Sequence, residues 1–379
     1  MVPLRVFGNM YLIRILMIAV IAGAPIWSHS VCAHPATGIV VDRTGNVYFS
    51  DLETIWKLDQ LGHVSIFRPG VRGRHIHELT IDSEGNIYGG DYSYQGQNAV
   101  SEIWKMTPSG ISSSLLAPTT DPPRGMSIWL DHAGNMYLIE QNNHTRSRTI
   151  LLRRSPDGQV TTMAGGAFGH QDGKGTSAKF GSIGGLAFGP DGSLYMTDGT
   201  SVRKVTTDGT VTTVANNLAA RAPDDKPTLF GGPEPIMTGL AVNSAGTIYV
   251  ADAGNRRLLR IGNDGKPTVV LREVPPYFPN GVTTAADGTV YVLEFSFIPP
   301  GTWGGARVRK VAPDGTSSFF ATAGTGPADS ASSTGQRQAV ATNLSTATTA
   351  PRLNYVLAIF GLLLFSGLTM IWLRRKRRT

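Results

Sequence analysis

The chain has 379 residues and a formal net charge of +7, with 45 glycines and 23 prolines. This length holds one large domain or two ordinary ones, and so many glycines and prolines indicate many tight turns. The positive charge lies at the two ends, because residues 34–351 carry 26 basic and 27 acidic side chains. A central part without net positive charge lacks the electrostatic footprint of a phosphate binder, so we expect no nucleic-acid partner.

The first 33 residues predict a secretory signal peptide. Two arginines near the start accompany an apolar run over residues 15–27, and residues 31–33 (VCA) place small side chains before a cleavage point. Cleavage after Ala33 would remove Cys32, the single cysteine of the sequence, so the exported domain would contain no disulfide. An uncleaved N-terminal anchor is the alternative.

Residues 34–322 contain two short motifs that alternate six times. The first consists of an apolar strand, a turn ending in glycine, and a second strand that contains tyrosine and ends in an acidic residue. Its six copies are GIVVDRTGNVYFSD, ELTIDSEGNIYGGD, SIWLDHAGNMYLIE, GLAFGPDGSLYMTD, GLAVNSAGTIYVAD and GVTTAADGTVYVLE. Their turn glycines are spaced by 40, 49, 58, 54 and 42 residues: Gly45, Gly85, Gly134, Gly192, Gly246 and Gly288.

The second motif supplies another pair of strands, as in IWKLDQLGHV and VRKVTTDGTV. Each repeat is therefore a four-stranded antiparallel unit with strands A, B, C and D, joined by tight turns in which glycine adopts a positive φ. Such a unit cannot bury both of its faces alone, whereas six units can close around a channel. We predict an all-β, six-bladed β-propeller over residues 34–322, with each blade made of four consecutive strands.

The repeats resemble those of NHL-repeat propellers. The resemblance is strongest in residues 164–215 (AGGAFGHQDGKG…VTTVA), and it implies the propeller fold rather than one activity. The segment FPNGVTTAADGTVYV, residues 278–292, is also similar to SMP-30/gluconolactonase-type propellers. That resemblance implies a central metal bound by Asn280, but Thr37 and its neighbour stand where a glutamate ligand would be needed.

The start of strand A gives the best candidate site. In a propeller this strand lines the channel, and the D–A and B–C loops share one face, here called the top face. Blade 2 departs from the small residues of the other blades, because it has His75, His77 and Glu78. The two histidines share one side of the strand, and imidazole binds zinc or transfers protons near neutral pH. The alternative is a strand start whose polar groups are hydrogen-bonded at the rim.

Three B–C connections are longer than a hairpin needs, and we expect them to be loops: Tyr92–Ser101, Gln141–Thr149 and Phe295–Ala306. They bring aromatic residues toward the top face, among them Tyr92, Tyr94, Phe297 and Trp303. Aromatic side chains with Asn and Gln are typical of protein or glycan contact surfaces. Six carboxylates that close the B strands, including Asp51 and Glu294, are expected to cap the B–C turns rather than to form a metal ring.

The C-terminal part predicts a membrane anchor. Residues 323–354 are small and polar and read as a disordered stalk rich in Ala, Thr and Ser. The apolar stretch 355–373 is long enough to span a bilayer, and the basic tail 374–379 should stay cytoplasmic. We therefore expect a single-pass protein of the cell membrane, with its propeller on the extracytoplasmic (periplasmic or cell-surface) side.

These features favour a membrane-anchored binding module that takes a protein or glycan ligand through its top-face loops. The expected contact residues are His75, His77, Glu78, Tyr92, Tyr94, Asn280, Phe297 and Trp303. The alternative is a metal-dependent hydrolase or lyase of the SMP-30/gluconolactonase-like or NHL lyase type. No cofactor is required by the sequence, and a divalent Ca or Zn ion, with His77 and Asn280 as candidate ligands, stays open. No converging catalytic set is evident.

Overall fold

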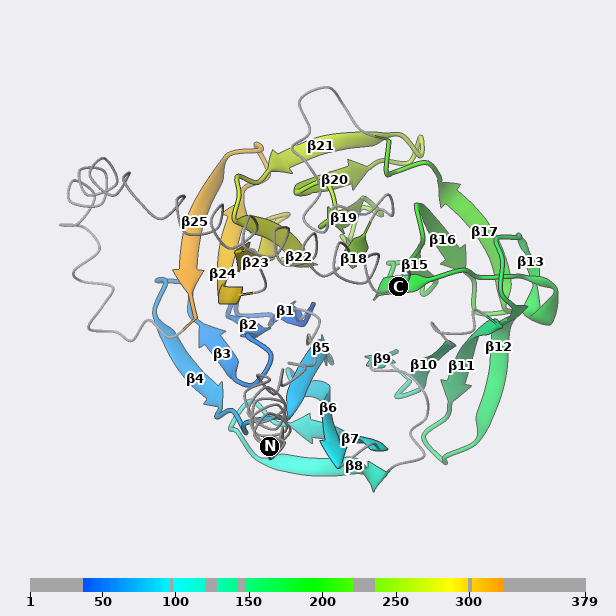
Figure 1. Cartoon of the computed structure of the whole chain (residues 1–379), viewed down its shortest axis with the longest axis horizontal. Helices are drawn as coiled ribbons and strands as arrows, with labels where there is room; N and C mark the ends of the chain where they lie inside the picture. The colour runs from blue at the N-terminus through cyan, green and yellow to red at the C-terminus, as the bar shows by residue number, and fades with distance from the viewer. Residues whose placement is uncertain are drawn as a thin grey trace, which may run out of the picture. The chain divides into compact units, whose positions relative to one another are not determined.

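The computed structural model describes residues 37–95, 98–119, 128–131, 133–141, 147–220, 236–298 and 302–323. Within them the chain forms six antiparallel sheets, each made of consecutive strands, and the sheets follow one another around a ring (Figure 1). The predicted six-bladed β-propeller is confirmed. The signal peptide, the stalk beyond Ala323, the apolar stretch 355–373 and the basic tail lie outside the described residues.

The first three blades occupy the N-terminal half of the ring. Blade 1 contains β1 (Ile39–Val41), β2 (Val47–Ser50), β3 (Ile55–Leu58) and β4 (Val64–Arg68). Blade 2 contains β5 (His75–Ile81), β6 (Ile87–Gln95), β7 (Asn98–Met106) and β8 (Ser112–Thr119). Blade 3 contains β9 (Ile128–Leu130), β10 (Met136–Gln141), β11 (Arg148–Arg154) and β12 (Val160–Ala167).

The last three blades complete the ring. Blade 4 contains β14 (Ile183–Phe188), β15 (Leu194–Asp198), β16 (Ser201–Val205) and β17 (Thr210–Ala215), and the two-residue strand β13 (Gly173–Lys174) adds a fifth, outermost strand. Blade 5 contains β18 (Met237–Val242), β19 (Ile248–Asp252), β20 (Arg257–Ile261) and β21 (Pro267–Arg272). Blade 6 contains β22 (Tyr277–Thr284), β23 (Val290–Ile298), β24 (Thr302–Val311) and β25 (Ser317–Thr322).

The A–B turns have the backbone conformation that their glycines predict. The six turn glycines have φ between 74° and 84°, a left-handed conformation that costs glycine little and other residues more. In every blade the glycine N–H donates to the carbonyl oxygen three residues earlier, as from Gly45 to Asp42. These turns lie opposite the top face, on what is here called the bottom face.

The core lies between neighbouring blades. One cluster joins Val40 and Ile55 of blade 1 to Ile76 and Trp104 of blade 2, and others join blades 3 and 4, 4 and 5, and 5 and 6. Burial of apolar side chains on both faces of a blade explains why one blade could not be stable alone. The ring closes with blade 6 packed on blade 1, because a Cβ atom on Gly281 would lie 2.3 Å from the carbonyl oxygen of Thr37.

Two of the expected B–C loops are instead continuations of strands. β6 and β7 remain paired out to Gln95 and Asn98, and β23 and β24 out to Ile298 and Thr302. The alternation Tyr92-Ser93-Tyr94 has the two-residue period of a strand, which explains the extended hairpin. In blade 6 this places Phe295 in the core, with 2% of its surface exposed, rather than on the rim.

Helix is almost absent from the described residues, where one 3-10 turn occurs at Gly175–Ser177. None of the helices in that part of the chain has the length and apolar character to cross a membrane. The predicted membrane span, 355–373, falls outside it.

Candidate functional site

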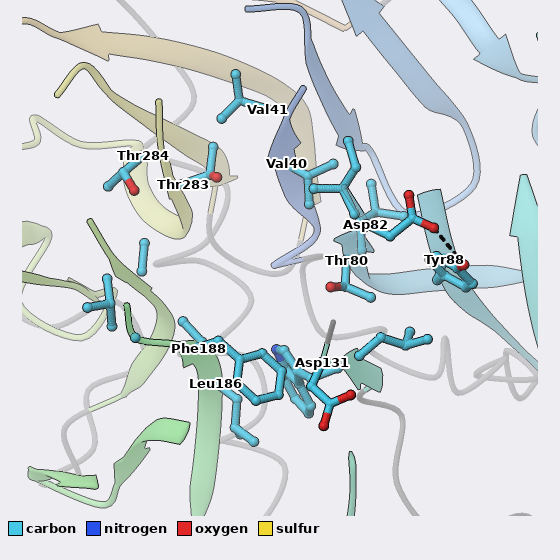
Figure 2. Close-up of a pocket in the computed structure, with 18 of the residues that line it drawn as sticks. Val40, Val41, Thr80, Asp82, Tyr88, Asp131, Leu186, Phe188, Thr283 and Thr284 are labelled. Carbon is cyan, nitrogen blue, oxygen red and sulfur yellow. Dashed lines mark hydrogen bonds between the residues drawn. The ribbon is translucent and has the colours of Figure 1, made fainter. Parts of the chain in front are cut away.

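The A strands of all six blades surround a central channel that contains two cavities. The larger cavity, of about 590 Å³, opens at the bottom face, where the A strands end. The smaller one, of about 50 Å³, lies nearer the top face and is lined by Thr37 and Glu78 among others. Figure 2 shows the larger cavity, with Val41, Thr80, Phe188 and Thr283 directed around it.

An apolar ring lies between the two cavities. Six buried side chains line both cavities, and each blade contributes one: Ile39, Leu79, Trp129, Leu186, Leu240 and Val282. Each is at most 7% exposed. Since these side chains line both cavities, the ring lies between them, and the two cavities are here called the top and the bottom compartment.

At the top compartment, the predicted site residues lie in β-bulges. The pairing of β5 with β6 shifts between Ile76 and Leu79, so His77 and Glu78 form a bulge at the start of the A strand. Asn280 occupies the corresponding bulge of blade 6. A bulge bends its strand and redirects the side chains within it, and such irregularities are common next to functional sites.

Glu78 occupies a position where four other blades have glycine. Those glycines are in tight contact with the next blade: a Cβ atom on Gly185 would lie 2.4 Å from the carbonyl oxygen of Thr238, and one on Gly239 would lie 2.7 Å from that of Asn280. A side chain would be excluded at these positions by backbone atoms. Blade 2 instead places a glutamate there, and this residue lines the small top cavity.

The structure brings His75, His77 and Tyr92 together. His75 and Tyr92 are directly paired across β5 and β6, and ring centroids are 6.1 Å apart for His75 and His77 and 6.5 Å apart for His77 and Tyr92. The carbonyl oxygen of His77 accepts hydrogen bonds from the N–H groups of Thr37 and Gly38, each at 2.8 Å. Blade 1 therefore holds the bulge of blade 2 in place.

The remaining predicted residues are only partly described. Asn280 is 1% exposed in the A strand of blade 6. Tyr94, Phe297 and Trp303 belong to β6, β23 and β24, but their side chains lie outside the described part of the structure. Their predicted exposure on the top face stays a prediction.

The carboxylates that close the B strands serve structural roles, and only some of them cap turns. Asp51 accepts the backbone N–H groups of Glu53 and Thr54, as expected. Asp252 also caps its turn, because it accepts hydrogen bonds from the backbone and the side chain of Asn255, and it lies 2.8 Å from Arg257. Asp198 instead lies 2.7 Å from Arg203 and accepts the N–H group of Gly181. Burial raises the pKa of the Asp198 carboxyl, and the Gly181 N–H group and Arg203 offset this only in part.

Blade 6 contains a larger buried charge cluster near the top face. Arg307 and Arg309 both contact Glu294 and Glu273, with Arg309 Nε 2.6 Å from Glu294 and 2.9 Å from Glu273. Burial, followed by the adjacent Glu294 carboxylate, raises the pKa of Glu273 to about 7. Since two arginines neutralise two glutamates, the cluster stabilises the corner of the blade rather than offering a free charge.

The expected metal ligands do not form a complete set. Among the described residues, no three His, Cys, Asp or Glu side chains converge on one point. His77 and Glu78 share a bulge in blade 2, whereas Asn280 comes from blade 6. Protein sites for zinc usually supply three or four such ligands, and calcium sites supply more oxygen atoms.

The sequence did not predict the bottom compartment. Its lining includes Thr80, Thr283 and Thr284, hydroxyl groups in strands where the other blades have mainly apolar residues. That contrast between blades was visible in the aligned repeats. The cavity itself was not, because its volume depends on how six blades close.

Comparisons with known proteins support the fold. No family model matches the chain, and no curated protein matches it. Solved structures are similar to it: a virginiamycin B lyase from Staphylococcus aureus (16% identity, TM-score 0.46, covering 76% of this chain and 84% of the lyase) and a gluconolactonase from Xanthomonas campestris (14%, 0.47, 68% and 83%). A luciferin-regenerating enzyme has 13% identity and a TM-score of 0.50, with coverage of 78% and 98%. This last similarity agrees with the propeller fold and, at such identity, concerns the fold alone.

Proposed function

We propose that the protein is a membrane-anchored, extracytoplasmic propeller that binds a protein or glycan ligand at its top face, centred on blade 2. One observation carries this proposal. Glu78 replaces a glycine that packs tightly on the neighbouring blade elsewhere in the ring, and it is a lining residue of the top compartment. The fold does not need a glutamate at this position, since the other blades do without one. A residue that departs from the repeat pattern at the mouth of the channel is therefore expected to contact a ligand.

The neighbours of Glu78 suit recognition of polar groups on a larger ligand. The rings of His75, His77 and Tyr92 are in contact with one another, and the partly exposed His75 and Tyr92 can both stack on a ligand and hydrogen-bond to it. The top cavity of about 50 Å³ is too small for an entire ligand molecule, so a ligand would rest on the mouth. This opening suits a protein or glycan ligand that places one chemical group in the cavity while the rest of it stays outside.

Replacement of Glu78 by glycine tests this proposal. The change restores the residue that the other blades use, so the fold should be retained while the carboxylate is lost. Full-length protein in lipid nanodiscs would be applied to a glycan array and to an array of purified extracellular proteins. We expect Glu78→Gly to weaken the strongest binding at least tenfold, and Tyr94→Ala or Trp303→Ala to weaken it by about 1–3 kcal/mol, as aromatic contact residues do.

The matched control is Asp287→Asn, which removes a carboxylate from a bottom-face turn of blade 6. This variant should bind like the unmodified protein. Unchanged binding by Glu78→Gly together with a loss in Asp287→Asn would move the site to the bottom face and refute the proposal.

A metal-dependent hydrolase or lyase is the second proposal. It is favoured by the burial of His77 and Asn280, polar residues that would not be buried at the channel without some role. The proteins of similar structure include a lyase, a gluconolactonase and a luciferin-regenerating enzyme. Metal analysis of the purified protein separates the two proposals: a stoichiometric divalent ion that is lost in Asn280→Ala would favour the enzyme, and its absence the binding module.

The membrane anchor is part of the proposal and has its own test. A chain that ends at Ala350 lacks the apolar stretch 355–373 and the basic tail. We expect the cell to secrete this shortened chain as a soluble propeller, measured by fractionation and by protease accessibility. If the shortened chain stays in the membrane after the signal peptide is cleaved, the anchor lies elsewhere.

A further inference from the structure

We propose that the bottom compartment is a second binding site, for a small organic cation with an apolar body. The cavity measures about 590 Å³, within the range of small-molecule sites, and the A strands of all six blades line it. The apolar ring lines its inner end. Three properties of its wall define the ligand.

One side of the pocket is aromatic. Trp129 of blade 3 and Phe188 of blade 4 line it from neighbouring blades. Phe188 is held by an edge-to-face contact with Tyr137, with ring centroids 5.3 Å apart, and it remains partly exposed. Aromatic rings favour an apolar or aromatic body, and their faces also attract cations.

The opposite side carries hydroxyl groups. Thr283 and Thr284 of blade 6 line the cavity away from Phe188, and Thr80 of blade 2 lines it nearer to Asp131 (Figure 2). Within the described part of the chain, none of these three side chains makes a hydrogen bond to another residue. Each hydroxyl can therefore donate to, or accept from, a polar group of a ligand without breaking an internal bond.

The rim of the pocket is acidic. Asp82, Glu84 and Asp131 line it at the A–B turns of blades 2 and 3, and none of the described lining residues is basic. Asp82 also accepts hydrogen bonds from its own turn, including one of 2.8 Å from the Tyr88 hydroxyl. Such bonds keep these aspartates ionised, because they lower the pKa of Asp82 and of Asp131 although burial alone would raise it.

These properties select one chemical class. Negative charge beside low-dielectric walls raises the local concentration of cations, and no lining cation is present among the described residues to cancel it. The ammonium group of a ligand would lie at the rim beside blades 2 and 3, and its apolar body against Trp129 and Phe188. Amines with an aromatic or alkyl body satisfy both requirements, whereas carboxylates of the same size do not.

Three probes of one carbon skeleton test the inference: 3-phenylpropylammonium, 3-phenylpropanol and 3-phenylpropanoate. Their dissociation constants would be measured by calorimetry or ligand-observed NMR on the full-length protein in zwitterionic nanodiscs, with empty discs as the blank. We expect the ammonium probe to bind about tenfold more tightly than the carboxylate, with the alcohol between them, and the difference to shrink in high salt.

Variants then locate the site. Thr284→Trp should fill the pocket and reduce binding of all three probes, whereas Thr212→Trp, on the outer strand β17, should not. Glu84→Gln should weaken the ammonium probe about threefold or more and leave the alcohol unchanged. Its control is Asp264→Asn, an acidic residue in a turn of blade 5 that does not line the pocket. Thr80→Val removes one hydroxyl at constant size, in case Thr284→Trp fails to fold.

The outcomes test separately whether the pocket binds a ligand and whether it prefers cations. Equal binding of the three probes, or no effect of Glu84→Gln on the ammonium probe, would refute the cation class. Probe binding that is absent, or that neither Thr284→Trp nor Thr80→Val changes, would refute the pocket as a site. Neither outcome touches the top-face proposal, whose variants lie on the other side of the apolar ring.

Discussion

Blades 1–3 and blades 4–6 have the same fold, but they differ in the face at which polar side chains stabilise the turns. In blades 1–3 each A–B turn contains an Asp–Asn–Tyr set: Asp42 accepts hydrogen bonds from Thr44, from Asn46 and from the Tyr48 hydroxyl. Burial and the Asp42 charge raise the pKa of Tyr48 to about 12. In blades 4–6 the position of this aspartate is occupied by Gly189, Asn243 and Ala285.

At the top face, the more extensive side-chain contacts belong instead to blades 4–6. Blades 4–6 contain buried arginine–carboxylate pairs, with Arg203 fully buried against Asp198. In blade 3 the corresponding pair, Glu140 and Arg148, has a half-exposed arginine, and in blade 1 Asp51 binds backbone N–H groups and Trp56. Blade 2 is the exception among the first three blades, because Arg68 makes two hydrogen bonds to the buried Asp91 and is about as exposed as Arg307 and Arg309 of blade 6.

The contrast shows that the blades share a need to hydrogen-bond the buried polar groups at their turns, although the residues that make these bonds differ. Each blade must satisfy the buried polar groups at its turns, and carboxylates do so either with local amides or with an arginine. The candidate sites occur where single blades depart from the repeat. His77 and Glu78 lie at the top of blade 2, and the threonines of the bottom compartment lie in blades 2 and 6.

We expect the largest loss of stability when a buried ion pair of blades 4–6 is broken. In Arg203→Met the Asp198 carboxylate would lose its cation in a buried site, and Asp172 would lose a 2.8 Å partner. Breaking such a pair costs about 3–5 kcal/mol, so chemical denaturation should show a large loss of stability. Arg148→Met, in the exposed pair of blade 3, should cost less than about 1 kcal/mol. Similar losses in both variants would contradict the contrast at the top face.

A smaller effect is expected at the bottom turns. Asp42→Ala removes five hydrogen bonds and leaves the Tyr48 hydroxyl without its acceptor, so we expect a loss of about 2–3 kcal/mol. Asn243→Ala, at the same position of blade 5, removes two backbone hydrogen bonds and should cost about 1 kcal/mol. Thermal unfolding of both variants measures the difference, and an equal shift would show that the tyrosine contact contributes nothing.

The smallest effect concerns pH. The raised pKa of Glu273 means that the folded state holds this proton more tightly than the unfolded chain, whose glutamates ionise near 4.5. Its contribution to stability is therefore full below about pH 4.5 and decreases as the pH rises toward 7. Glu273→Gln should flatten the decrease by less than about 1 kcal/mol per pH unit, since Arg307 and Arg309 stay in place. Parallel profiles of stability against pH would show that Glu273 ionises normally.

The sequence predicted the blades well, because strands with a two-residue period and turns with glycine at positive φ are local features. It also singled out His77 and Glu78, because aligned repeats make a departure visible, and their role as site residues stays a prediction. It failed at the B–C connections of blades 2 and 6, where aromatic residues were taken for loop residues although Tyr92 and Phe295 continue the strand pattern. The bottom compartment depends on the closure of six blades, and no single segment specifies its volume.

The apolar ring has a consequence for how the domain can be used. Ile39, Leu79, Leu186 and their three partners line both cavities, so the two proposed sites are separated along the axis by apolar side chains. Two different molecules could therefore occupy the two faces at the same time, and each face could change its chemistry by substitution while the other kept its own.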